Sequence, residues 1–83
     1  MPRFYFHLRN DMDVPDEEGR EFPDLAAARA CAVSLARFEV SEMVKTEGRV
    51  VLHHRIDIED GNGRALDSVA FRDVLKVEEQ QPN

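Results

Sequence analysis

Residues 23–48 have the sequence PDLAAARACAVSLARFEVSEMVKTEG, and this stretch decides the fold because it predicts the one long helix of the chain. It is rich in alanine and has no internal glycine or proline, a composition that favours helix. Asp24 is suited to the N-cap, since its carboxylate can accept an orphan backbone N–H bond and favours the positive end of the helix dipole. Gly48 is a natural residue at the C-terminal end of such a helix.

The apolar side chains of this helix cover a wide arc at about 100° per residue. The arc is wider than one small sheet face can cover. We therefore expect either a bend near Phe38 or a second half of the helix that packs on something else, such as a partner subunit. The central face holds Leu25, Ala28, Ala32, Leu35, Ala36 and Met43, flanked by Cys31 and Phe38 on one side and by Val33, Val40 and Val44 on the other.

Two segments before the helix predict a β-hairpin. Residues 3–9, RFYFHLR, alternate between apolar and polar side chains, as a half-buried strand does. Residues 10–19, NDMDVPDEEG, hold five acids, a proline and a closing glycine, which is typical of a loop. Residues 20–22 are long enough for a short return strand, so we expect a hairpin with a long acidic tip.

Two segments after the helix predict a second hairpin. Residues 50–60 alternate again, and Gly61-Asn62-Gly63 forms a turn because Asn and Gly tolerate positive φ. Residues 64–77 return as a strand, with a bulge or break near Arg72-Asp73, where the alternation slips. Residues 78–83, EEQQPN, form a polar tail.

The order strand, short strand, helix, strand, strand predicts an α+β fold in which two β-hairpins flank one long helix (ββαββ). We expect a mostly antiparallel four-stranded sheet with the helix on one face, as a single domain over residues 1–77. The layer under the helix is predicted to hold Phe4, Phe6, Leu8, Leu52, Ile56 and Ile58. The opposite face is predicted to carry an interaction surface of Tyr5, His7, Arg9, His53, Arg55 and Asp57.

Three segments resemble a family of short bacterial proteins classed only as a domain of unknown function. They are MPRFYFHLRND at 1–11, PDEEGREFPDLAAARACAVSLAR at 15–37 and HRIDIEDGNGRALDSVAFRDVLKV at 54–77. Members open M-P-R-[FY]-[FY]-F-H, carry D-E-E-G-x-E-x-P-D-x-x-x-A-R and end with a G-x-x-L-x-x-x-x-F-R-D-like strand. A looser similarity links the F-P-D hairpin and alanine-rich helix to the N-terminal half of HicB-type antitoxins. The resemblance implies a fold and brings no activity.

The charge balance disfavours two classes of partner. The 83 residues include 17 acids and 11 bases, for a net charge of -6. Nucleic-acid binders need a basic stripe, and an anionic membrane surface repels acidic chains. No apolar run approaches the roughly 18 residues of a membrane span, and the N-terminus has none of the features of a signal peptide. We expect a cytoplasmic protein.

Candidate metal ligands are few. His7 and His53 could share a sheet face, but no HxH or HxxxH spacing is present. His54 is interpreted as a hydrogen-bonded packing residue near the sheet margin. The acidic residues of 11–18 do not match the EF-hand pattern and are interpreted as a solvated surface. We expect no bound metal and no cofactor.

Candidate catalytic residues are equally few. Cys31, the single cysteine, lies beside the apolar face of the helix, where cysteine packs as a small hydrophobe. Glu39 projects near the apolar arc, where a carboxylate needs an arginine partner or exposure past the sheet edge. We expect no catalytic residue and no enzymatic activity.

The surface predicted opposite the helix combines aromatic, cationic and planar groups, a mixture found at recognition surfaces. We expect a non-enzymatic protein-interaction or regulatory module that acts through its sheet face or edge. The alternative is a small acidic inhibitor, related to phages or defence systems, that mimics nucleic-acid charge. A small core and an unpaired strand edge favour a homodimer, with Tyr5 and Arg55 in the interface and the acidic loop at its periphery.

Overall fold

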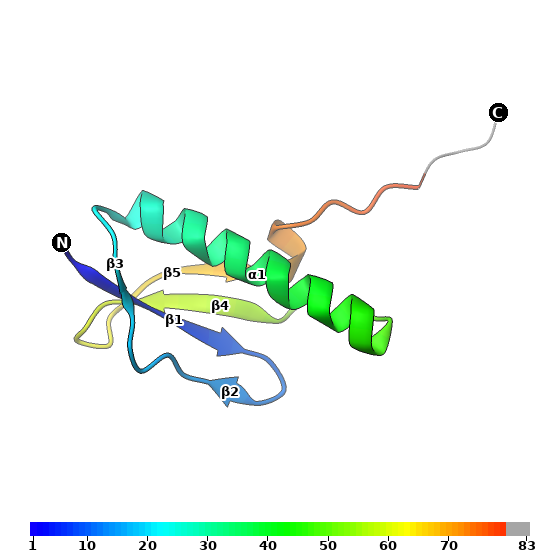
Figure 1. Cartoon of the computed structure of the whole chain (residues 1–83), viewed down its shortest axis with the longest axis horizontal. Coiled ribbons are helices and arrows are strands. Elements are labelled where there is room, and N and C mark those ends of the chain that lie inside the picture. Colours follow the sequence, from blue (N-terminus) through cyan, green and yellow to red (C-terminus); the bar gives the residue numbers. More distant parts are fainter. Residues whose placement is uncertain (80–83) are drawn as a thin grey trace.

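The computed structural model describes residues 1–79, and its elements form an α+β fold of one long helix and an antiparallel sheet (Figure 1). The elements are β1 (Arg3–Arg9), β2 (Asp13–Val14), β3 (Arg20–Glu21), α1 (Leu25–Glu47), β4 (Arg55–Glu59), β5 (Ala65–Ala70) and the short 3-10 helix η1 (Phe71–Asp73). Within the described residues, no helix is both long and apolar enough to cross a membrane. Most of the predicted tail, residues 80–83, lies outside the described residues.

The sheet has five strands rather than the predicted four. The main path is β2-β1-β4-β5, and β3 pairs separately with β1. The start of β1 pairs with β3 (Arg3↔Glu21), whereas its end pairs with β2 (Arg9↔Asp13). The predicted return strand is therefore present, but the loop before it contains a two-residue strand that the sequence pattern did not indicate. A tight turn makes this second pairing possible, because the side chain of Asn10 accepts a hydrogen bond from the Met12 N–H at 2.8 Å.

The predicted helix limits are confirmed. The Asp24 side chain accepts a hydrogen bond from the Ala27 N–H at 2.9 Å, which satisfies one orphan donor of the first turn. Gly48 adopts a left-handed conformation with φ of 67°, and its N–H donates to the Val44 carbonyl. Local sequence alone therefore sets both ends of α1.

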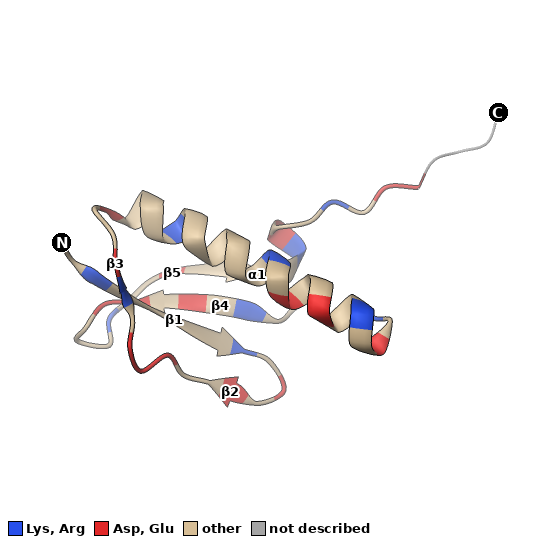
Figure 2. Cartoon of the chain, in the orientation of Figure 1, with Lys and Arg blue, Asp and Glu red and all other residues tan. Residues whose placement is uncertain are grey.

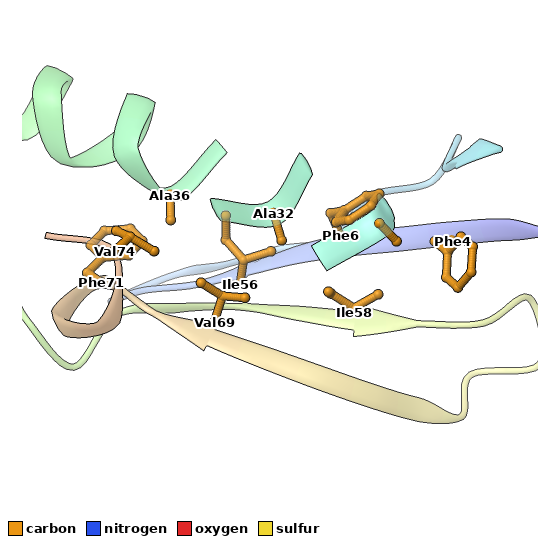
Figure 3. Packing of buried hydrophobic residues seen from close by; sticks show 10 residues of the cluster. Phe4, Phe6, Ala32, Ala36, Ile56, Ile58, Val69, Phe71 and Val74 are labelled. Carbon is orange, nitrogen blue, oxygen red and sulfur yellow. The ribbon is translucent and has the colours of Figure 1, made fainter. Parts of the chain in front are cut away.

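The core lies between α1 and the helix-facing side of the sheet (Figure 3). Three fully buried alanines let the helix approach the strands closely, and it packs mainly on β4 and β5. The buried residues are Phe4, Phe6, Ala28, Ala32, Ala36, Ile56, Ile58, Val69, Phe71 and Val74. Of the predicted sheet layer, Phe4, Phe6, Ile56 and Ile58 are in this core and Leu8 is packed against it.

The prediction for the start of the second hairpin was wrong. The strand expected from residue 50 begins at Arg55, and Leu52 lies in a turn with 40% of its surface exposed. Backbone hydrogen bonds explain the difference. The Leu52 carbonyl accepts from the Arg72 N–H at 3.2 Å, and the His54 carbonyl accepts from the Phe71 N–H at 2.8 Å. These carbonyls anchor η1 to residues 52–54, which therefore form a turn instead of the start of a strand.

The end of the second hairpin breaks where the alternation slips. β5 stops at Ala70 and the chain turns through η1, so that Phe71 and Val74 both reach the core. The Arg37 Nε donates to the Val74 carbonyl at 2.9 Å and ties this turn to α1. The predicted break is confirmed, and the predicted strand over 64–77 is shorter.

The second half of α1 keeps part of its apolar arc exposed. The helix continues as one element past the ends of the strands (Figure 1). Phe38 is 58% exposed and Val44 is 49% exposed. Within residues 1–79, the sheet therefore covers only part of the arc, and the expected contact with a partner subunit stays a prediction.

Gly19 and Gly48 provide a matched test of the hairpin. Their φ angles are 69° and 67°, so alanine at either position meets the same backbone strain of about 1 kcal/mol. At Gly19 an added Cβ would also lie 2.9 Å from the Phe4 carbonyl oxygen and from Tyr5 Cε2, whereas at Gly48 nothing lies within 4 Å. We expect Gly19→Ala to lower the free energy of unfolding by at least about 2 kcal/mol and Gly48→Ala by about 1 kcal/mol, measured in urea. Equal losses in the two variants would contradict the close packing of residue 19 against β1.

Candidate functional site

The sheet side that faces away from α1 is the surface on which the predicted interaction residues meet. We call it the open face and define it as Tyr5, His7, Arg9, Arg55, Asp57, Glu59 and Ser68. The β1–β4 register places Tyr5 opposite Glu59, His7 opposite Asp57 and Arg9 opposite Arg55. Alternation along two antiparallel strands therefore brings five of the six predicted residues together. The sixth, His53, lies in the turn before β4.

Asp57 is the centre of the open face. Its carboxylate accepts hydrogen bonds from Arg9 Nε at 3.1 Å, Arg55 Nε at 2.9 Å and Ser68 Oγ at 2.9 Å. Arg9 and Arg55 are directly opposite each other in the ladder, where two like charges would repel. Asp57 lies between them and offsets that repulsion. Sequence alternation placed these residues on one face, but Ser68 was missed because its strand partner depends on the β4–β5 register.

The pKa of Asp57 reflects these contacts. Partial burial raises the pKa, but the hydrogen bonds from Arg55, Ser68 and Arg9 together lower it by more. The net result is a pKa below the usual 3.8 of an aspartate. Asp57 is therefore ionised in the folded protein at all ordinary pH values.

His7 links the open face to the loop between β2 and β3. Its Nδ1 accepts a hydrogen bond from the Asp16 N–H at 3.0 Å, and its Nε2 lies 3.3 Å from Glu59 Oε1. Glu59 also lies 3.6 Å from Arg9 Nη2. Both ring nitrogens of His7 thus have protein partners, and the charges of the open face neutralise one another.

Asp16 has a structural role that sequence reasoning missed when it interpreted the acidic loop as solvated. Its carboxylate accepts hydrogen bonds from the N–H groups of Phe6, Glu18 and Gly19, each at 3.1 Å. Phe6 lies on the part of β1 between the residues that pair with β3 and those that pair with β2. The side chain of Asp16 therefore takes the place of a strand partner at that point.

The pKa of Asp16 is also lowered. Burial raises the pKa, whereas the backbone N–H groups of Gly19, Phe6 and Glu18 and the nearby His7 lower it by more. The folded state consequently prefers the ionised carboxylate.

The other two histidines lie at the end of β4. His54 is 4% exposed, and its ring packs edge-on against Phe71 and His53, with centroids 5.7 and 5.1 Å away. Its Nε2 is 3.5 Å from Asp11 Oδ1, but neither ring nitrogen makes a hydrogen bond to any residue of 1–79. The prediction of a packing residue is confirmed, and that of a hydrogen-bonded one is wrong.

The described residues hold no cluster of metal ligands. Across residues 1–79, no group of three His, Cys, Asp or Glu side chains converges as a metal site would require. The Cys31 Sγ accepts a contact from Arg20 Nη1 at 3.6 Å, and Ser68 Oγ donates to Asp57. The open face is therefore a charge-balanced polar surface whose side chains are hydrogen-bonded or ion-paired to one another.

A family model described as a domain of unknown function (DUF6894) matches residues 3–72. The match covers most of the chain, and the chain belongs to this family. No curated protein and no solved structure matches it.

The lowered pKa values of Asp16 and Asp57 predict how stability depends on pH. Each group binds protons more weakly in the folded state, so its contribution is complete above the unfolded pKa of about 3.9 and is lost as pH falls through the folded pKa. We expect Asp16→Ala and Asp57→Ala each to lower the free energy of unfolding by about 1 kcal/mol at pH 6, because solvent reaches both carboxylates. The difference from the unmodified protein should shrink as pH falls below about 3.9, measured by urea denaturation.

Glu17→Ala is the matched control for that experiment, because Glu17 neighbours Asp16 and its side chain is exposed and makes no hydrogen bond within residues 1–79. Its stability should follow that of the unmodified protein across the whole pH range. A loss in Asp16→Ala that stayed constant from pH 6 to pH 2 would show that the carboxylate charge is not what stabilises the loop.

Proposed function

We propose that this DUF6894 domain is a non-enzymatic protein-interaction module that acts through the open face and the adjoining edge of β5. The main support for this proposal is that the helix covers only one side of the sheet. The helix covers one side of the sheet, and within residues 1–79 no helix or strand covers the other side. A partner that binds there would meet side chains that are already held in position by one another.

The edge of β5 supports the same proposal. β5 is the last strand on the sheet path and has six residues, Ala65–Ala70, so its outer backbone groups have no strand partner within the described chain. Such an edge can accept a strand from another chain. Asp67 on β5 faces α1, where it contacts Arg29 Nε at 3.1 Å, and an inward-pointing charge of this kind limits indiscriminate edge pairing.

The partner that we propose first is a second copy of the chain. A two-fold dimer presents the same patch from both sides, so positive and negative groups of one copy can meet their opposites in the other. The open face holds both Arg55, with half of its side chain exposed, and the acidic Asp57 and Glu59.

The looser similarity to HicB-type antitoxins stays a prediction.

The alternative of a nucleic-acid mimic is less well supported. A mimic needs a continuous row of unpaired acids along one face. Figure 2 shows a basic residue followed by acidic ones along β4, next to the basic end of β1. Asp57 and Glu59 are both in contact with Arg9, so their charges are partly cancelled.

Sedimentation equilibrium tests the self-association. We expect a homodimer at about 100 µM, well above the dissociation constant of a modest interface. Tyr5→Asp and Arg55→Glu should weaken it, because each places a new negative charge on the open face. Glu17→Lys, a charge reversal in the acidic loop, should leave the dimer intact. A monomer mass for the unmodified protein at this concentration would exclude the homodimer.

A further inference from the structure

A hollow of about 330 Å³ lies on the helix side of the sheet, beside the core. It exists because α1 packs mainly on β4 and β5 and leaves the helix-facing side of β1 partly uncovered. The segment from β2 to β3 closes its outer side. The hollow is lined by Phe6, Leu8, Val14, Pro15, Asp16, Glu18, Gly19, Arg20, Leu35, Glu39 and Ile56.

The floor of the hollow is apolar, whereas its walls also carry charged side chains. Phe6 and Leu8 of β1 and Ile56 of β4 come from the sheet, and Leu35 comes from the helix. Val14 closes the outer side and is 50% exposed. The volume is at the small end of the roughly 300–1,000 Å³ of ligand pockets, so the hollow suits a compact molecule rather than a cofactor.

Glu39 gives the hollow its chemical preference. It lies one helical turn beyond Leu35 and is only partly exposed. No Lys, Arg or His of residues 1–79 forms an ion pair with its carboxylate. A carboxylate that is partly removed from water beside apolar side chains is stabilised by a cation.

The other charged groups of the lining also favour a positively charged ligand. The Asp16 carboxylate is already occupied by three backbone N–H groups, and the Glu18 side chain makes no ion pair within the described residues. Arg20, the one cation of the lining, has its Nη1 3.6 Å from the Cys31 Sγ. Three carboxylates against one guanidinium give the hollow a net negative charge.

We infer that this hollow binds a small amphipathic amine, whose apolar body packs on Leu8, Val14 and Leu35 and whose ammonium group pairs with Glu39. The site lies on the opposite side of the sheet from the open face, so it is independent of the proposed interaction surface. Its ligand class follows from two features, the apolar side chains on the floor of the hollow and a wall carboxylate that has no ion-pair partner within residues 1–79.

Titration of the ¹⁵N-labelled chain with phenethylamine, followed by two-dimensional NMR, tests this inference. We expect saturable shifts at Leu8, Val14, Gly19, Leu35 and Glu39, with a dissociation constant of about 1 mM. Phenethyl alcohol, which keeps the apolar body without the charge, should bind about fivefold more weakly or worse, and phenylacetate should not bind.

Two variants separate the role of Glu39 from general charge. Glu39→Gln should weaken phenethylamine binding by about fivefold. Glu42→Gln removes the same charge from the same helix at a residue outside the lining and should leave binding unchanged. The spectra of both variants without ligand report whether they are folded. The inference is overturned if phenethylamine causes no saturable shifts, if phenylacetate or the alcohol binds equally well, or if Glu39→Gln and Glu42→Gln behave alike.

Discussion

The close packing of three alanines of α1 on the sheet is the contact on which the rest of the structure depends. Ala28, Ala32 and Ala36 are fully buried, and with no long side chain between them the helix lies close over β4 and β5. A helix placed there covers β1 only in part, since Phe4 and Phe6 are buried but Leu8 is not fully covered. The hollow beside Leu8 is therefore a consequence of this packing. Because the alanine side chains are small, the helix lies close to the sheet and covers few strands.

No single strand pairs with the whole edge of β1 that faces away from β4. A side chain supplies the missing hydrogen bond in the gap. β3 pairs with its start and β2 with its end, and between them Asp16 accepts the Phe6 N–H. The same carboxylate holds Glu18 and Gly19, so the loop is fixed to the strand that it borders. A loop fixed in this way forms a firm wall for the hollow on one side of the sheet and holds His7 on the other.

The features that sequence predicted are those set by neighbours along the chain. Asp24 and Gly48 cap α1 through bonds that span three or four residues, and the turn at 61–63 uses the positive φ of Gly63. The two-residue β2, the late start of β4 and the role of Asp16 depend on contacts between distant segments. Leu52 illustrates this, because its place in the alternation favoured a strand while its carbonyl is held by the Arg72 N–H.

The candidate site shows the same division between local and distant information. Alternation could assign Arg9, Arg55 and Asp57 to one face, because side-chain direction has a period of two along a strand. It could not show that Asp57 bridges two arginines, because that follows from the register in which β1, β4 and β5 align. This bridge reduces the positive charge that the two arginines present to a partner. Arginines that are paired with a carboxylate attract an anionic partner less strongly than unpaired arginines do. The partner that we propose for the open face would therefore be selected by the pattern of its charges rather than by its net charge.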